Sequence, residues 1–288
     1  MVEINVLNEY AEELERRLRL QTFPVAVKLL ESEADIPEGP VNRHVKGQTL
    51  RALMTHKGAD IPEGALRPLR DLGYHLALCQ GFALSRREGI TVAMFKEDMW
   101  CFEPIVGYGW MEPPQYFLDG HNRFPQDVKD LEAGKNYASD FPRLEVGKYK
   151  GVVSAPLTTA NFEPDLAMIY CDSSQLSLLL LGREYTDGHD LPCHLSSHAA
   201  CVYSVVTAIK SGEFQVAIPC RGDHYFALAS DTELILSFPI KKLEELMGGL
   251  RHLERNNYRL PRSPVMRIEP TFPESYVKIL EMMGLGNR

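Results

Sequence analysis

Four of the six cysteines in this 288-residue chain lie in two segments of similar layout. The first segment runs from Cys79 to Cys101 and the second from Cys201 to Cys220. In each, the pattern predicts a helix, a glycine that ends it, a strand with a Val-Ala pair and then the second cysteine. Four thiolates that meet at one site are typical ligands of an iron–sulfur cluster or a metal ion. The alternative is four isolated thiols in a core, because cysteine is also a common buried residue.

The spacing within the two segments favours a duplicated fold. Cys79 lies ten positions before Gly89, and Cys201 lies eleven positions before Gly212. Val-Ala pairs follow at 92–93 and 216–217. We therefore expect two related halves, 1–145 and 146–288, around a shared cleft. Because few identities are shared, a chance similarity within one compact domain is the alternative.

The segment DGHDLPCHLSSHAAC, residues 187–201, holds the densest collection of metal-ligand residue types in the chain. His194, His198 and Cys201 are spaced four and three apart, so on a helix they would share one face. Such a face suits zinc, an iron site, a mixed cluster or haem iron. If Ser196 or Ser197 caps the helix instead, His194 precedes it and the segment is a polar loop with surface histidines.

A catalytic thiol is a second class of function. Cys201 is expected in the first turns of its helix, where unpaired N–H groups lower a thiol pKa, and His198 is close enough in sequence to act as its base. This pair would make the protein a cysteine-dependent hydrolase or transferase. A third class is a non-catalytic small-molecule binding or regulatory protein with structural cysteines.

Glu97 and Asp98 precede Cys101, and Asp223 follows Cys220. These carboxylates are candidate acid or base groups, and the favoured alternative is that they are exposed turn carboxylates.

The elements that would position these residues mix strands and helices along the whole chain. We expect strands at 25–30, 90–95, 148–156, 165–170, 214–218, 225–229 and 234–238. Helices are expected at 4–18, 65–87, 126–133, 173–182, from Ser196 or Ser197 to 210, at 241–250 and near the C-terminus. The predicted fold class is therefore α/β or α+β.

The amino-acid composition excludes some classes of binding partner. The net charge of −8 and the absence of long Lys/Arg clusters give no electrostatic footprint for nucleic acid or an anionic membrane. The first twenty residues lack the basic start and apolar stretch of a secretory signal, so we expect a cytoplasmic protein with reduced thiols. The expected partner is a small-molecule substrate or an electron carrier, and a homo-oligomer is left open.

Several blocks of the chain resemble the domain of unknown function 169 family. The resemblance implies a relation to uncharacterised proteins that are frequent in anaerobic bacteria and archaea. The resemblance covers nearly the whole chain, and Phe23 to Lys28 fits the family's beginning. The blocks are CQGFALSRREG, KEDMWCFEP, FPRLEVGKYKGVVSAPL, FEPDLAMIY, AIPCRGDHYFALASDTELILSFP and RIEPTFPESY.

The resemblance implies that Cys79, Cys101 and Cys201 occupy family cysteine positions. Cys220 stands where a small residue is expected as often as a cysteine, and His224 stands where the family usually has an arginine. Three cysteines with a histidine or an open position are therefore as credible as four thiols.

The same resemblance makes Arg86 or Arg87 a candidate for binding an anionic substrate, and we favour Arg87 as a catalytic residue beside His198. The leading hypothesis is an iron–sulfur or related metal site, lined by Cys79, Cys101, Cys201 and Cys220, for redox chemistry on a small molecule. The protein would then be an iron–sulfur dependent oxidoreductase, and zinc, haem or no cofactor are the alternatives.

Overall fold

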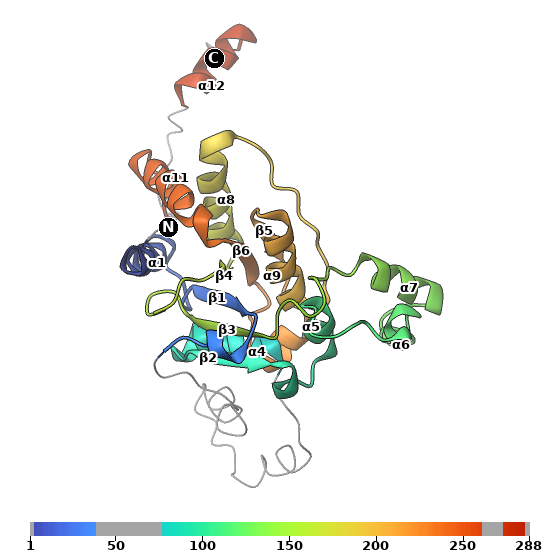
Figure 1. Ribbon diagram of the computed structural model, residues 1–288. Coiled ribbons are helices and arrows are strands. Elements are labelled where there is room, and N and C mark those ends of the chain that lie inside the picture. Colours follow the sequence, from blue (N-terminus) through green and yellow to red (C-terminus); the bar gives the residue numbers. More distant parts are fainter. Residues whose placement is uncertain (1–2, 39–76, 261–272, 286–288) are drawn as a thin grey trace, which may run out of the picture.

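The computed structural model describes residues 3–38, 77–260 and 273–285, and a six-stranded sheet lies at its centre (Figure 1). The strand order is β2-β3-β1-β4-β6-β5, and each neighbouring pair is antiparallel. The strands are β1 (Val25–Leu30), β2 (Val92–Phe95), β3 (Gly151–Pro156), β4 (Leu166–Cys171), β5 (Gln215–Ala217) and β6 (Leu234–Pro239). An antiparallel sheet with helices places the fold in the α+β class.

Helices cover both faces of the sheet because alternate strand residues point to opposite sides. Val25 and Val27 face one core, which also contains residues of α4, α5 and α9, whereas Ala26 and Leu30 face the other, with α1, α8 and α11. The first face carries α4 (Leu78–Ala83), α5 (Phe102–Gly107), α9 (Ala200–Ser211) and α10 (Arg221–Phe226). The second carries α1 (Ile4–Leu18), α8 (Ser173–Asp187) and α11 (Leu243–Arg255).

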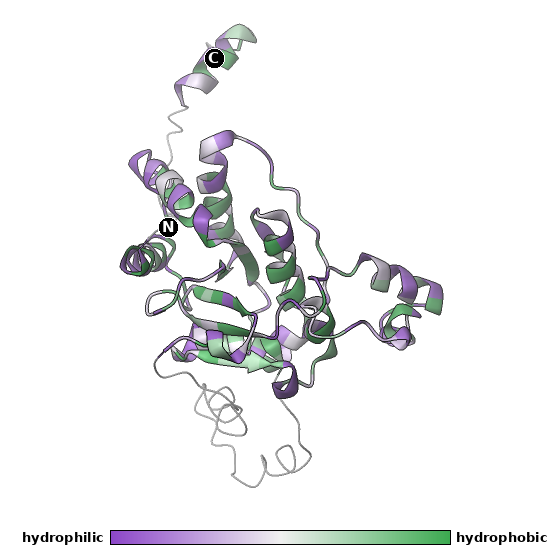
Figure 2. Cartoon of the chain, viewed as in Figure 1, coloured by the Kyte–Doolittle hydropathy of each residue, from purple (hydrophilic) through white to green (hydrophobic). Residues whose placement is uncertain are grey.

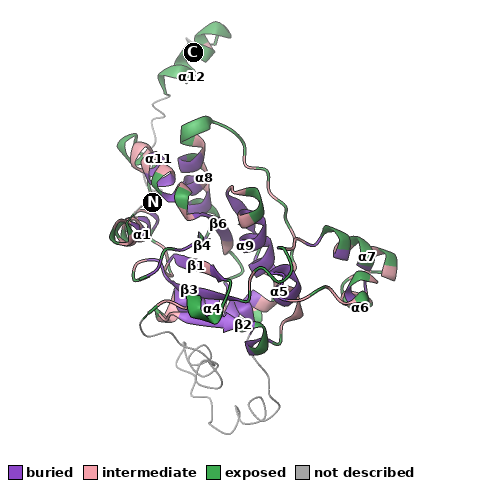
Figure 3. Cartoon of the chain, in the orientation of Figure 1, coloured by how far each residue is buried: buried purple, intermediate pink, exposed green. Residues whose placement is uncertain are grey.

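The remaining helices lie at the periphery. α6 (Gln115–Leu118) and α7 (Leu131–Asp140) extend to one side, and α12 (Glu274–Met282) projects away from the other elements (Figure 1). The strands are rich in hydrophobic residues (Figure 2), and they are buried, whereas α12 is almost entirely exposed (Figure 3). Among the described residues, no helix is both long and apolar enough to span a membrane.

The sheet has the same layout on either side of its centre. If β1, β2 and β3 are matched with β4, β5 and β6, the strand order reads the same from both edges. The registers agree as well, since Val27 lies opposite Ser154 in β3 and Met168 lies opposite Ser237 in β6. At the centre, Ala26 pairs with Ala167. The arrangement therefore has a pseudo-twofold axis between β1 and β4.

The strand pairing aligns the two cysteine segments one residue differently from the alignment of their Val-Ala pairs. Val92 lies opposite Ser154, and Gln215 lies opposite Ser237, so Val92 corresponds to Gln215 rather than to Val216. Each segment's helix nevertheless ends at the predicted glycine. Gly89 and Gly212 have φ values of 71° and 69°, the left-handed conformation that glycine adopts without strain.

Three predicted elements are wrong, and local side-chain caps explain two of them. Residues 225–229 form no strand, because α10 ends within them and the Asp223 side chain accepts from the Cys220 N–H at the start of that helix. α7 begins after Asp130, whose carboxylate accepts the Ala133 N–H, and not near 126. α9 begins at Ala200, after Ala199 with φ 47°, so neither Ser196 nor Ser197 is its cap. Most of the predicted 65–87 helix lies outside the described residues.

The contact between α8 and α11 behind the sheet leads to a stability prediction. A Cβ atom at Gly249 would meet the Gly182 carbonyl oxygen, a backbone atom that cannot move aside alone, whereas nothing lies near a Cβ at the adjacent Gly248. Gly249→Ala should therefore lower the free energy of unfolding by roughly 1–3 kcal/mol. Gly248→Ala, the matched control, should raise it by up to about 1 kcal/mol. Urea unfolding followed by circular dichroism measures both, and equal effects would contradict the close contact.

Candidate functional site

All four cysteines of the two sequence segments line one cavity of about 410 Å³. They come from four helices on the same face of the sheet. Cys79 and Cys201 are the second residues of α4 and α9, and Cys101 and Cys220 are the N-cap residues of α5 and α10. The structure thus brings together the four thiols that the sequence singled out.

The four thiols lie at two depths. Cys79 and Cys201 are buried, whereas Cys101 and Cys220 are half-buried, and none of the four forms a disulfide. A Cβ atom at Gly222 would lie 3.5 Å from the Cys220 sulfur and 3.8 Å from the Cys79 sulfur. Gly222 of α10 therefore lies beside the sulfur atoms of Cys79 and Cys220, which come from distant segments of the chain.

Each outer cysteine contacts a carboxylate from the first turn of its helix. The Cys101 thiol donates to Glu103 Oε2 at 3.4 Å, and the Cys220 thiol donates to Asp223 Oδ2 at 3.0 Å. Asp223 is buried, so the prediction of an exposed turn carboxylate is wrong. It is also wrong for Asp98, which is buried and accepts the Phe95 N–H.

Burial raises the pKa of all four thiols. Desolvation is the largest cause at each, and neighbouring negative groups add to it. The pKa of Cys220 rises to about 11, with Asp223 as the second cause. The thiols are therefore protonated at neutral pH when nothing is bound, and a bound cation would be needed to hold them as thiolates.

The spacing of the donors distinguishes between kinds of metal site. Within the part of the chain that the structure describes, no three His, Cys, Asp or Glu side chains are grouped to hold a single metal ion. A zinc ion needs its thiolates about 2.3 Å from one point. In a cubane cluster each thiolate binds a different iron, so the ligands surround a larger volume. The described residues therefore show no preformed centre for a single metal ion.

The two candidate histidines occupy different places. His198 lines the cysteine cavity, where its ring packs edge-on against Tyr137 with centroids 5.6 Å apart. His194 is exposed and lines another cavity beside Cys193. The predicted helical stripe of His194, His198 and Cys201 is wrong, because α9 begins only after both histidines.

The geometry gives little support to a Cys201–His198 catalytic pair. Among the described residues, no hydrogen bond joins these two side chains. Burial raises the pKa of Cys201 well above its ordinary value and lowers the pKa of His198. An activated nucleophile needs the opposite shift at its thiol.

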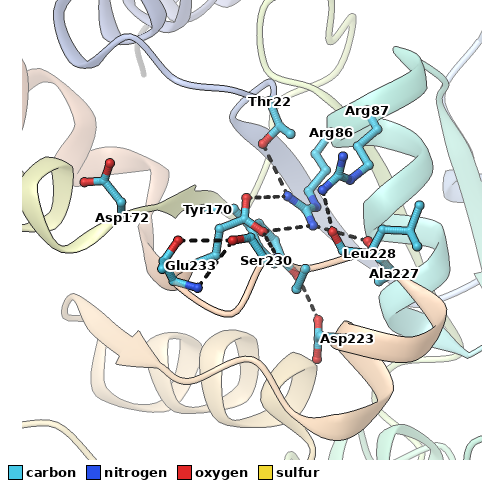
Figure 4. Close-up of polar contacts among 12 residues, drawn as sticks. Thr22, Arg86, Arg87, Tyr170, Asp172, Asp223, Ala227, Leu228, Ser230 and Glu233 are labelled. Atoms are coloured by element: carbon cyan, nitrogen blue, oxygen red, sulfur yellow. Dashed lines mark hydrogen bonds and ion pairs between the residues drawn. The ribbon is translucent and has the colours of Figure 1, made fainter. Parts of the chain in front are cut away.

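A buried polar network connects the interior to the site (Figure 4). The Arg86 side chain is fully buried, forms an ion pair with Glu233 at 3.0 Å and donates to the Ala227 carbonyl at 3.2 Å. Its guanidinium lies 3.9 Å from the centroid of the Tyr170 ring. The Tyr170 hydroxyl donates to Asp223 at 3.0 Å, and Asp223 holds Cys220.

Arg87, which we predicted to be a catalytic residue, does not line the cysteine cavity. It is half-buried and donates to the carbonyl of Leu228, a residue with a positive φ of 55°. Both arginines lie in the π-helical segment Leu84–Glu88 that continues α4. In this structure they join that segment to the chain after α10.

The mouth of the cavity contains residues that the sequence analysis missed. Trp100 and Phe226 are exposed there and pack edge to face, with ring centroids 5.2 Å apart. Tyr225, Arg221 and Arg123 also line it. The available signal was position, because Trp100 directly precedes Cys101 and Arg221 directly follows Cys220.

Comparisons with known proteins identify relatives but no activity. A family model described as uncharacterised ArCR, domain of unknown function 169, matches residues 13–249. An uncharacterised protein of Methanocaldococcus jannaschii is 22% identical over 257 residues, which cover 88% of this chain and 97% of the relative. No solved structure matches.

The Arg86 network leads to a second stability prediction. Glu233→Gln removes the charge that neutralises the fully buried Arg86 and should lower the free energy of unfolding by about 3–5 kcal/mol. Glu213→Gln is the control, because Glu213 pairs with Lys242 near the surface and should cost about 1 kcal/mol or less. Chemical unfolding measures both, and similar losses would show that Arg86 does not depend on Glu233.

The raised thiol pKa values predict slow alkylation at neutral pH. In protein with nothing bound, iodoacetamide labelling of Cys220 should rise about tenfold per pH unit from pH 7 towards its pKa of about 11. A short cysteine peptide in the same reaction should level off near its ordinary pKa of about 8.5. Peptide mapping by mass spectrometry gives both rates. Fast labelling of Cys220 at pH 7 with no further rise would contradict the burial effect.

Proposed function

Because the chain belongs to the domain of unknown function 169 family, whose description names no activity, we propose its function from the cavity itself. Cys79, Cys101, Cys201 and Cys220 bind an iron–sulfur cluster, and the cluster serves redox chemistry on a small molecule. The protein acts in the cytoplasm, where its thiols stay reduced and an electron carrier supplies or removes electrons.

One observation carries this proposal: four cysteines from four different helices line a single cavity. Burial in a hydrophobic core does not by itself bring four cysteines to one cavity. Cys171, for example, is buried in the core on the opposite face of the sheet. The four thiols are unpaired, which leaves each free to bind iron.

The pseudo-twofold arrangement adds support. Each half supplies one cysteine at the second position of a helix and one at a helix N-cap. α4 packs on β2 and β3, and α9 packs on the corresponding β5 and β6. A site near the axis would receive two ligands from each half. This supports the predicted duplication, and the halves 1–145 and 146–288 stay a prediction.

The surrounding residues would set the conditions of the reaction. A bound cluster supplies one-electron transfer. Trp100 and Phe226 at the mouth limit the access of water, and buried Cys79 and Cys201 hold the inner side away from solvent. Tyr108 donates to the Cys201 carbonyl at 3.0 Å and fixes the first turn of α9.

Metal analysis tests the proposal. Protein purified without oxygen and reconstituted with iron and sulfide should be brown and contain iron and acid-labile sulfide in equal amounts. Cys79→Ser and Cys201→Ser should each lose most of both, because a ligand of the cluster is removed. Cys171→Ser is the matched control, since Cys171 is equally buried but faces the other core, and it should keep the cluster.

The half-buried cysteines allow the same comparison. Cys101→Ser and Cys220→Ser should lower the iron content, whereas Cys193→Ser, also half-buried but outside this cavity, should not. Colourless wild-type protein without iron or sulfide would overturn the proposal. If only Cys220→Ser keeps a full cluster, the site has three cysteine ligands and an open position.

A further inference from the structure

A second cavity of about 850 Å³ adjoins the cysteine cavity. The two share a wall formed by Arg123, Ser197, His198, Arg221 and Tyr225. The second cavity therefore lies directly beside the one that the thiols line. Two adjacent cavities can together bind a larger ligand than the cysteine cavity alone can hold.

The charges on this wall are unequally compensated. Arg123 forms ion pairs with Glu103 at 3.0 Å and with Asp127 at 3.1 Å. Arg221 is exposed, and among the described residues no carboxylate forms an ion pair with it. Its guanidinium lies over the Tyr225 ring, 5.4 Å from the centroid, in a position open to both cavities. Arg221 is thus a free cation at the junction of the cavities.

Two carboxylates also line the second cavity, and neither forms an ion pair with Arg221. Asp127 pairs with Arg123, and Asp231 is exposed and lies 3.9 Å from the ring nitrogen of His224. The Arg123 side chain, which also lines the junction, has an Nε atom without a hydrogen-bond partner in the described residues. A guanidinium binds a carboxylate through two parallel hydrogen bonds, so these donors favour a carboxylate over a neutral ligand.

Aromatic side chains also line the mouth of the cysteine cavity. Tyr225, Trp100 and Phe226 are exposed by 68%, 44% and 41%, although large aromatic side chains are usually more buried. Three exposed aromatics within one pocket lining provide flat apolar surface. A planar conjugated group can stack there while its carboxylate reaches Arg221.

We propose that the two joined cavities bind a planar, conjugated carboxylate, with the carboxylate on Arg221 and the flat group among Trp100, Tyr225 and Phe226 beside the thiols. As a substrate site, it rests on the proposed function. The binding itself needs no cluster, because every group that makes it belongs to the protein.

Isothermal titration of cluster-free protein tests the proposal with cinnamate and its uncharged isostere cinnamamide. Cinnamate should bind about tenfold or more tightly than cinnamamide, which corresponds to about 1.4 kcal/mol or more. Arg221→Gln should bring the two affinities together. Arg221→Lys, which keeps the charge but loses the planar fork, should retain part of the difference.

Arg16→Gln is the control, because it makes the same change of charge at an exposed position on α1, across the sheet. It should leave the preference for cinnamate unchanged. Equal affinities in the wild type, no binding of either compound, or a preference that survives Arg221→Gln would each overturn the proposal. Iron content is measured separately, so failure of this site and failure of the cluster are distinguishable.

Discussion

The fully buried guanidinium of Arg86 constrains the arrangement of the whole site. A charge with no contact to water must be neutralised and hydrogen-bonded, or its burial costs more than the fold can supply. Glu233 and the Ala227 carbonyl meet this need from the chain that follows α10, and Tyr170 of β4 covers the guanidinium. Arg86 continues the helix of Cys79, while Tyr170 holds Asp223 beside Cys220. The Arg86–Glu233 ion pair and its neighbours therefore help to fix the positions of Cys79 and Cys220, one from each half of the sheet.

Much of this frame could be predicted from the sequence, because apolar periodicity reports which segments are buried. The β1 prediction at 25–30 is confirmed, and the mixture of strands and helices predicts the fold class. The meeting of four cysteines was predictable from their paired spacing. Helix starts were not, because α9 begins after Ala199 in a left-handed conformation that propensity assigns to glycine. The run from 225 to 229 was predicted as a strand, yet its first two residues belong to α10, which begins after the N-cap Cys220 and is stabilised there by the Asp223 side chain.

Buried charge was the other feature beyond sequence reasoning. Asp98, Asp223 and Arg86 are polar residues whose average place is the surface, and only their partners make burial tolerable. Asp98 accepts the nearby Phe95 N–H, but Arg86 meets Glu233 and Asp223 meets Tyr170, which are distant in sequence. No local pattern reports such pairs. The exposed aromatic side chains at the cavity mouth could not be predicted either, because a sequence does not distinguish exposed aromatic residues from buried ones.

The two halves share a layout but differ at their outer cysteines. Asp223 beside Cys220 points to the interior, where Tyr170 and the Arg86 network hold it. Glu103 beside Cys101 instead pairs with Arg123, which lines both cavities. Cys220 therefore contacts a carboxylate that is held in the core, whereas Cys101 contacts a carboxylate that pairs with Arg123. Because both cysteines are helix N-cap residues, the partners of these carboxylates, rather than the cysteines, make the two environments different.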